Sequence, residues 1–444
     1  MNVTSTALRI DTLLEARWII PVDPSHTTLI DHAIAIQDGK IIAILPTTEA
    51  LSQFSPKQHF VLNHHLIIPG LINTHTHAAM TLMRGMADDL PLMDWLKNCI
   101  WPVEKQWVDT DFVLAGTTLA CAEMLKGGIT CFNDMYFFPE KAVEAAAQTG
   151  MRAAIGLISI EFPTAYATDA NDYLAKGLML REQYLEHPTL SFCLAPHAPY
   201  TVSDSTLSNI FTFANQLDLP IHMHLHETSE EIASSLHDFG IRPIERLQKL
   251  NLLGPNLIGV HMVHLTNEEI NLLKLHNCNV VHCPSSNMKL ASGIAPIVDL
   301  VNASINVAIG TDGAASNNRL DMFEEMRLTS LLGKVTHGAQ ALPAHQVLRM
   351  ATLNGAITLG IEALTGSLSV GKAADITAID FSGLELSPCF NPLSHLIYVA
   401  GREHVSHVWV NGQLLLNEGE LVTLNEAEII ERTQYWQNRI TSKQ

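Results

Sequence analysis

Eight short apolar segments between residues 71 and 310 alternate with polar, helix-like stretches, and this alternation constrains the fold more than any other feature. Strands that alternate with helices form a parallel sheet with helices packed against it, and eight such units close into a barrel. The sequence therefore predicts an α/β fold, a (β/α)8 TIM-like barrel, with strands at 71–75, 129–134, 152–157, 191–196, 221–226, 257–261, 279–282 and 306–310.

The two ends of the chain are rich in β-strand signals instead. Strand-like segments precede the barrel at 18–22, 32–36 and 41–44, and Asp38-Gly39 is a hairpin turn signal. Further segments follow it at 375–379, 407–410 and 413–416, before a polar helical stretch at 421–444. We therefore expect a small β-sandwich built from both chain ends, with its first part at 1–68, the barrel at 69–365, and its second part plus the terminal helix at 366–444.

Composition excludes several classes of protein. The formal net charge of −19 disfavours binding to nucleic acid or to an anionic membrane surface, so neither is an expected partner. The seven cysteines contain no CxxC pair, which argues against a disulfide framework and a cysteine-based zinc site. The sequence has no apolar stretch of about 18 residues and no signal-peptide pattern at its start. We therefore expect a cytoplasmic protein.

Imidazole and carboxylate side chains gather where the predicted strands end. His75 and His77 end the first strand and, two residues apart, share one face of it. Active-site residues of a barrel lie at these strand ends. The other members of the group are His197 after the fourth strand, His222, His224, His226 and Glu227 at the fifth, His261 and His264 at the sixth, His282 at the seventh and Asp312 at the eighth.

These residue types suit a catalytic metal site. Two or three histidines and one aspartate leave one position on a divalent ion open for a water molecule. The ion lowers the pKa of that water to about 7. A glutamate beside such a site suits proton transfer, and Glu227 reaches it only if the strand ends near His226 and turns. Periodicity alone does not choose the ligand among the three histidines of the fifth strand, because all three share a face.

Five segments, in order along the chain, resemble the amidohydrolase superfamily, and within it the 5-methylthioadenosine/S-adenosylhomocysteine deaminases and their chlorohydrolase relatives. They are Pro-Gly-x-x-Asn-x-His-x-His at 69–77, Pro-His-Ala-Pro-Tyr at 196–200, His-x-x-Glu-Thr at 224–228, Cys-Pro-x-Ser-Asn at 283–287 and Gly-Thr-Asp-Gly-Ala-Ala-Ser-Asn at 310–317. A sixth similarity, Gly-x-Leu-x-x-Gly-Lys-x-Ala-Asp at 366–375, leads into the C-terminal β-rich part.

The resemblance implies one divalent metal ion, most often zinc, held by His75, His77, His224 and Asp312. It implies that Glu227 carries a proton to the substrate ring and that His261 orients the attacking hydroxide. Asp312 would also accept a proton, so Glu227 and Asp312 would both contact the substrate. Binuclear relatives use a lysine or a bridging carboxylate on the fourth strand, and 191–200 contains neither, which favours one ion.

The implied reaction is hydrolytic deamination of an adenine nucleoside to the inosine analogue and ammonia. Glu104 would bind ribose hydroxyls and His197 would contact the nucleoside. Residues 153–180 contain no arginine, and the apolar loop at 160–167 suits 5'-methylthioadenosine or adenosine better than the homocysteine carboxylate of S-adenosylhomocysteine. The alternatives are an aminohydrolase or chlorohydrolase acting on guanine or a triazine, and a barrel that binds without turnover. The apolar barrel helices favour a homo-oligomer.

Overall fold

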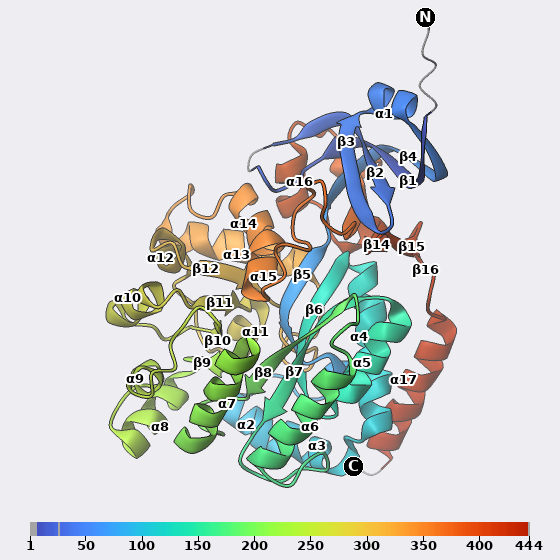
Figure 1. Ribbon diagram of the computed structural model, residues 1–444. Coiled ribbons are helices and arrows are strands. Elements are labelled where there is room, and N and C mark those ends of the chain that lie inside the picture. Colours follow the sequence, from blue (N-terminus) through green and yellow to red (C-terminus); the bar gives the residue numbers. More distant parts are fainter. Residues whose placement is uncertain (1–6, 25–26, 443–444) are drawn as a thin grey trace, which may run out of the picture.

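The computed structural model describes residues 7–24 and 27–442, and their strands form two separate eight-stranded sheets. The first sheet is a barrel with helices around its outside, and the second lies at one end of it and contains strands from both ends of the chain (Figure 1). This arrangement confirms the predicted barrel with a β-rich part built from both termini.

All neighbouring strands of the barrel are parallel and follow one another in chain order. Their interior positions are buried on both faces, which explains the apolar runs in the sequence. Each predicted barrel strand overlaps an observed one. The strands are β5 (Leu71–Thr76), β6 (Ile129–Tyr136), β7 (Arg152–Ser159), β8 (Leu190–Pro196), β9 (Ile221–Leu225), β10 (Leu257–His261), β11 (Asn279–His282) and β12 (Asn306–Ile309).

Helices that lie between these strands or follow the last of them cover the barrel (Figure 1). Several start at side chains that satisfy the free N–H groups of a first turn. Asp109 accepts from Phe112 N at the start of α4, and Thr266 forms a capping box with Glu269 at the start of α10. The covering helices are α4 (Thr110–Lys126), α5 (Pro139–Thr149), α6 (Ala170–Gln183), α7 (Asp204–Leu217), α8 (Ser229–Phe239), α9 (Pro243–Lys249), α10 (Asn267–Leu275), α11 (Pro284–Lys289), α12 (Ile297–Asn302), α13 (Met322–His337), α14 (Ala344–Met350) and α15 (Leu353–Thr358).

The barrel closes where β12 meets β5. Thr74 Oγ1 donates to Ile309 O at 2.8 Å, and Asp312 N donates to His75 O at 3.0 Å. The backbones approach so closely that a Cβ on Gly310 would lie 2.8 Å from His75 N, so only glycine fits there. This closure brings Asp312 beside His75.

The second sheet has the strand order β16-β15-β14-β13-β4-β1-β2-β3. Strand β4 links its two halves, because it pairs in parallel with β1 and antiparallel with β13. The strands are β1 (Leu8–Ile19), β2 (Leu29–Gln37), β3 (Lys40–Pro46), β4 (Phe54–Pro69), β13 (Ile376–Asp380), β14 (Val405–Val410), β15 (Gln413–Asn417) and β16 (Glu420–Leu421), with α1 (Thr47–Gln53) before β4 and α16 (Pro392–Tyr398) between β13 and β14. The predicted module boundaries at 68/69 and 365/366 stay a prediction.

Two features of this sheet differ from the sequence-based expectation. The strand predicted at 18–22 is wrong in its placement, since β1 runs from Leu8 to Ile19 and ends before Pro21, which has no N–H to donate. Strand β4 was not predicted, because most of its side chains from Ser55 to His65 are polar and at least partly exposed. The predicted terminal helix is present as α17 (Glu426–Thr441), which packs Trp436 against Phe112 of α4.

A segment between β5 and α4 extends over the ends of the strands. It contains η1 (Ala78–Met83), α2 (Leu92–Trp95), a π-helical turn η2 (Leu96–Ile100) and α3 (Trp101–Trp107). Its buried apolar side chains form a cluster that includes Trp95, Trp107 and Trp436. No helix in the described ranges 7–24 and 27–442 is long and apolar enough to cross a membrane.

Candidate active site

A cavity of about 600 Å³ opens at the carboxyl ends of the barrel strands. One end of it is polar and the other is apolar. The polar end is lined by His77, His197, His224, Glu227, His261, Asp312 and Ser316, and the apolar end by side chains of the β5–α4 segment and of the loop after β7. The cavity therefore contains six of the side chains that the sequence placed at the strand ends: His77, His197, His224, Glu227, His261 and Asp312.

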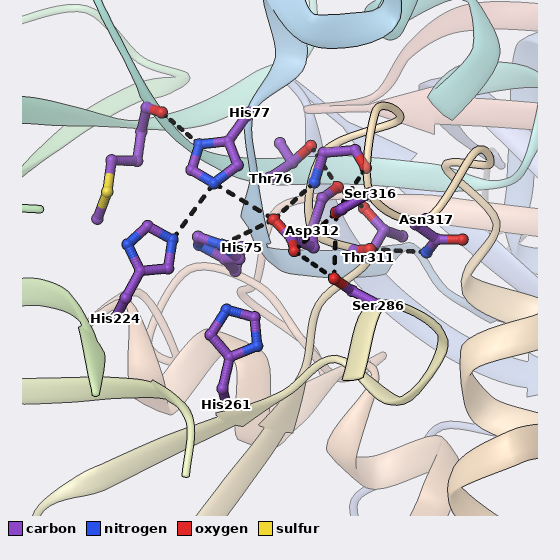
Figure 2. Close-up of polar contacts among 12 residues, drawn as sticks. His75, Thr76, His77, His224, His261, Ser286, Thr311, Asp312, Ser316 and Asn317 are labelled. Carbon is purple, nitrogen blue, oxygen red and sulfur yellow. Dashed lines mark hydrogen bonds and ion pairs between the residues drawn. The ribbon is translucent and has the colours of Figure 1, made fainter. Parts of the chain in front are cut away.

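His75, His77 and Asp312 meet at the polar end (Figure 2). The Nε2 atoms of His75 and His77 each lie 3.3 Å from Asp312 Oδ1. Both histidines point to the same side of β5, as their spacing predicted. Their potential donor atoms, together with that of Asp312, lie within 4.8 Å of one another, which is compact enough to surround one metal ion.

His224 faces His77, and backbone carbonyls fix the proton positions of both rings. His77 Nδ1 donates to Met135 O at 2.6 Å, and His224 Nδ1 donates to His197 O at 2.8 Å. Burial lowers the pKa of His224 well below its usual value, so its ring is neutral. In the arrangement with one proton on each ring, held at Nδ1, the two Nε2 atoms, 3.3 Å apart, both direct a lone pair into the space between the rings.

This arrangement fits a divalent cation. His75 Nε2 is buried and has no hydrogen-bond partner within the described chain, and buried polar atoms without a partner are rare. Imidazole lone pairs and a carboxylate oxygen directed at one point, with the other ring nitrogens bonded to the surrounding protein, are the donor set of a metal site.

Asp312 is held by three donors in a left-handed backbone conformation with φ of 62°. Its Oδ2 accepts from Ser286 Oγ at 2.6 Å and from Ser316 Oγ at 2.9 Å, and its Oδ1 accepts from Gly313 N at 2.7 Å. Sequence reasoning assigned no role to Ser286. The one sequence feature that could have pointed to Ser286 is its place in the Cys-Pro-x-Ser-Asn segment at 283–287.

Glu227 and His261 lie beside each other at the polar end of the cavity. His261 Nε2 is 3.7 Å from Glu227 Oε2, and His261 Nδ1 donates to Asn287 Oδ1 at 2.8 Å. Burial raises the pKa of Glu227, which suits a group that takes up and releases a proton. Asn287 is a second residue of the 283–287 segment for which sequence reasoning gave no role.

A sharp turn brings Glu227 into the site, as the sequence required. β9 ends at Leu225, and His226 has a φ of 56°. Glu231 stabilises this turn, because its carboxylate accepts from His226 N at 3.0 Å and from Glu227 N at 2.8 Å. Burial raises the pKa of Glu231 to about 8.

The expectation that His222, His224 and His226 share one face is wrong for His226. The turn directs its ring away from the cavity, where Nε2 accepts from Ile244 N at 3.1 Å and Nδ1 donates to His264 O at 3.0 Å. His264 also points away, with its Nε2 2.9 Å from Ser292 O. Of the alternatives left open by the sequence, His261 and not His264 therefore lines the cavity, while His222 lies below His224 and contacts His75.

Glu104 and His197 flank the cavity from two different elements. Glu104 on α3 accepts from Tyr136 OH at 2.8 Å, and burial raises its pKa to about 7. His197 follows β8, and its Nδ1 is 3.1 Å from Thr201 Oγ1. Burial lowers the pKa of His197 to about 3, so the ring is neutral. The remaining wall is apolar and includes Ile100, Trp101, Ile160, Phe162, Pro163 and Tyr166.

A (β/α)8 barrel with this donor set at its carboxyl end defines a barrel hydrolase of the metal-dependent class. The amidohydrolase family profile matches residues 66–415, and the chain belongs to the amidohydrolase family.

Two curated relatives and one solved structure are similar over nearly the whole chain. A 5-methylthioadenosine/S-adenosylhomocysteine deaminase from Saccharophagus degradans is 48% identical, over 98% of this chain and 97% of that protein. A 5'-deoxyadenosine deaminase from Methanosarcina barkeri is 40% identical, over 96% of this chain and 97% of that protein. The crystal structure of an adenosine deaminase from Xanthomonas campestris with bound zinc has a TM-score of 0.97 and 46% identity, covering 98% of this chain and 100% of that one.

Proposed function

We propose that the protein hydrolyses the 6-amino group of an adenine nucleoside, giving the inosine analogue and ammonia. The observation that carries this proposal is a single cavity that holds a candidate metal-ligand cluster, a candidate proton carrier and a partly buried carboxylate, Glu104, that suits a ribose. The names of the three similar proteins described above, each a deaminase of adenosine or a 5'-derivative of it, support the same reaction.

We propose that His75, His77, His224 and Asp312 hold one zinc ion. When bound, such an ion lowers the pKa of a coordinated water and makes hydroxide available near neutral pH. Two candidate ligand groups in the described chain, one with His77 and Asp312 and one with His224 and His261, share His75 and so overlap in space. This overlap supports one ion, as does the absence of lysine and carboxylate side chains from β8.

Glu227 is the proton carrier in this proposal. It lies beside His261, and its raised pKa lets it pass a proton from the attacking water to the ring nitrogen next to the reacting carbon. His261, oriented by Asn287, directs the water. Asp312 accepts the remaining proton and returns it to the departing amine, with its Oδ2 fixed by Ser286 and Ser316.

We further propose that Glu104 binds the ribose hydroxyls and that His197 contacts the nucleoside. Both side chains line the cavity between the metal-ligand cluster and its apolar end. The apolar end, with Ile160, Phe162 and Tyr166, suits a methylthio or methyl group at the 5' position. Methylthioadenosine, 5'-deoxyadenosine and adenosine are therefore the preferred substrates, ahead of S-adenosylhomocysteine.

An ammonia-release panel tests this proposal. Zinc-loaded protein is assayed with adenosine, 5'-methylthioadenosine, 5'-deoxyadenosine, S-adenosylhomocysteine, guanine and simple triazines, and kcat/KM is determined for each. We expect the highest value for a nucleoside with a small, uncharged 5' group. A higher value for guanine or an aminotriazine would replace the proposal with the aminohydrolase alternative, and chloride release from a chlorotriazine would replace it with the chlorohydrolase alternative. Release of neither ammonia nor chloride from any compound would support a binding protein.

A further inference from the structure

His222 is buried below the metal-ligand cluster and contacts one of its members. Its Nε2 is 2.9 Å from His75 Nδ1, and both rings are fully buried. We propose that His222 is a positioning residue that fixes the proton of His75 on Nδ1, and that it thereby sets the metal affinity of the site. This inference rests on the proposed metal site.

The geometry of His75 gives His222 this role. A neutral imidazole carries one proton, so His75 can direct an Nε2 lone pair at an ion only if Nδ1 holds the proton. His222 Nε2 is the hydrogen-bond partner of that Nδ1. In the ion-binding arrangement, His222 must therefore accept with Nε2 and carry its own proton on Nδ1.

His75 differs in this respect from the other two histidines of the proposed ligand set. His77 and His224 donate from Nδ1 to backbone carbonyl oxygens, which only accept and so permit one proton arrangement. An imidazole such as His222 can accept or donate. His75 is therefore the ligand whose proton position depends on another side chain.

The pair of His75 and His222 has a second arrangement with the same two protons. In it, His222 Nε2 donates to His75 Nδ1, and His75 Nε2 donates towards Asp312 Oδ1, 3.3 Å away. That arrangement blocks the Nε2 lone pair. Ion binding excludes that arrangement, and in the ion-binding one His222 Nδ1 carries a proton without an acceptor among the described residues.

Three substitutions at one position test the role of His222. In His222→Leu the acceptor is removed, in His222→Gln the side-chain amide occupies roughly the place of Nε2, and in His222→Asn it occupies roughly that of Nδ1. The matched control is His282→Leu on the neighbouring strand β11. His282 is equally buried and also has an unpartnered Nδ1, and within the described chain it has no hydrogen bond or ring contact to a proposed ligand.

Zinc affinity of each variant is measured by competition with a chromophoric chelator, and thermal unfolding of the zinc-free protein reports the fold. We expect His222→Leu to weaken zinc binding by about 10- to 100-fold, the usual effect of removing a partner of a ligand histidine. The zinc affinity of His222→Gln should stay close to that of the wild type, and the affinity of His222→Asn should be as weak as that of His222→Leu. The control His282→Leu should bind zinc with wild-type affinity.

The possible outcomes separate this inference from the proposed function. If the wild type binds no zinc, the proposed metal site fails. If the wild type binds zinc and folded His222→Leu binds it equally well, the inference about His222 is wrong and the metal site stands. If the Leu variant does not fold, the Gln and Asn variants decide, and equal affinities for these two would overturn the proposal.

Discussion

The Nε2 atoms of His77 and His224 face each other at 3.3 Å. The Nδ1 atom of each ring donates to a backbone carbonyl oxygen, Met135 O at 2.6 Å for His77 and His197 O at 2.8 Å for His224. With one proton on each ring, held at Nδ1, both Nε2 atoms present a lone pair to the same space, where a cation can bind both. The backbone contacts thus suit the proposed role of both rings as metal ligands.

Removal of the metal should abolish activity. Dialysis against a chelator is expected to bring ammonia release to the uncatalysed rate, and added zinc should restore it. His224→Ala should not recover with zinc at concentrations that restore the wild type, because it lacks a proposed ligand. His237→Ala, a change at an exposed histidine of α8, is the control and should recover fully. Full activity in chelator-treated protein of verified zero metal content would contradict the mechanism.

Substitution of the proton carrier should lower kcat and leave metal binding intact. For Glu227→Gln we expect kcat to fall by about 10²- to 10⁴-fold, because an amide does not carry a proton. Zinc content, measured by atomic emission, should match the wild type. Glu230→Gln changes an exposed glutamate of the adjacent helix and should have no effect. Near-normal kcat in zinc-loaded Glu227→Gln would exclude the proposed role.

Loss of the ribose contact should affect nucleosides selectively. For Glu104→Ala, KM for nucleosides should rise by about 10- to 100-fold, since a hydrogen bond to a charged group contributes about 1.5–3 kcal/mol. The free base adenine lacks the ribose, so its slow turnover should change little. Glu144→Ala on α5 is a control outside the cavity. An equal effect on nucleoside and free base would remove the argument for a ribosyl substrate.

Nucleoside binding should weaken as the pH falls through about 7. Burial raises the pKa of Glu104 to about 7, so its carboxyl group is ionised above that pH and protonated below it. The ionised form accepts hydrogen bonds from two ribose hydroxyls, whereas the protonated form has one acceptor fewer. The pH profile of kcat/KM should therefore decline on the acid side with an apparent pKa near this value.

The control for this pH profile is Glu104→Gln, whose side chain does not titrate. Its kcat/KM should be lower than that of the wild type above pH 7 and should lose the decline assigned to Glu104. An unchanged profile in Glu104→Gln would assign the acid limb to another group, and the free base should show the same pH profile in both proteins.

The hydroxyl groups that hold Asp312 should contribute to activity without contacting the substrate. Ser286→Ala removes the 2.6 Å hydrogen bond to Oδ2 and leaves that of Ser316. We expect metal affinity or kcat to fall by about 10-fold or more, the usual range for a partner of a ligand. Ser208→Ala, on the exposed side of α7, is the control. Wild-type affinity and kcat in Ser286→Ala would show that Ser316 and Gly313 N suffice.

Much of this protein could be predicted from local patterns. The eight barrel strands are apolar because both of their faces are buried. Such apolar runs can be recognised from a few consecutive residues. The shared face of His75 and His77 follows from the two-residue period of a strand. Strand β4 was not predicted, because its polar half has no apolar pattern of its own and is stabilised by pairing with β1, which lies far from it in the sequence.

The roles of individual side chains at the strand ends could not be predicted in this way. His226 continues the periodic pattern of His222 and His224, yet its left-handed backbone turns it away. Contacts with Glu231 and with the loop after β10 stabilise that turn. Ser286 and Asn287 are ordinary polar residues until the fold brings them to Asp312 and His261.

The sequence by itself determined the barrel, the β-rich ends and the set of residues from which a metal site can be built, because strand periodicity and apolar burial are local properties. Only the tertiary structure decided which of those residues meet. His75 and Asp312 become neighbours because β12 closes on β5, and that closure depends on the curvature of the whole sheet and on the close approach at Gly310.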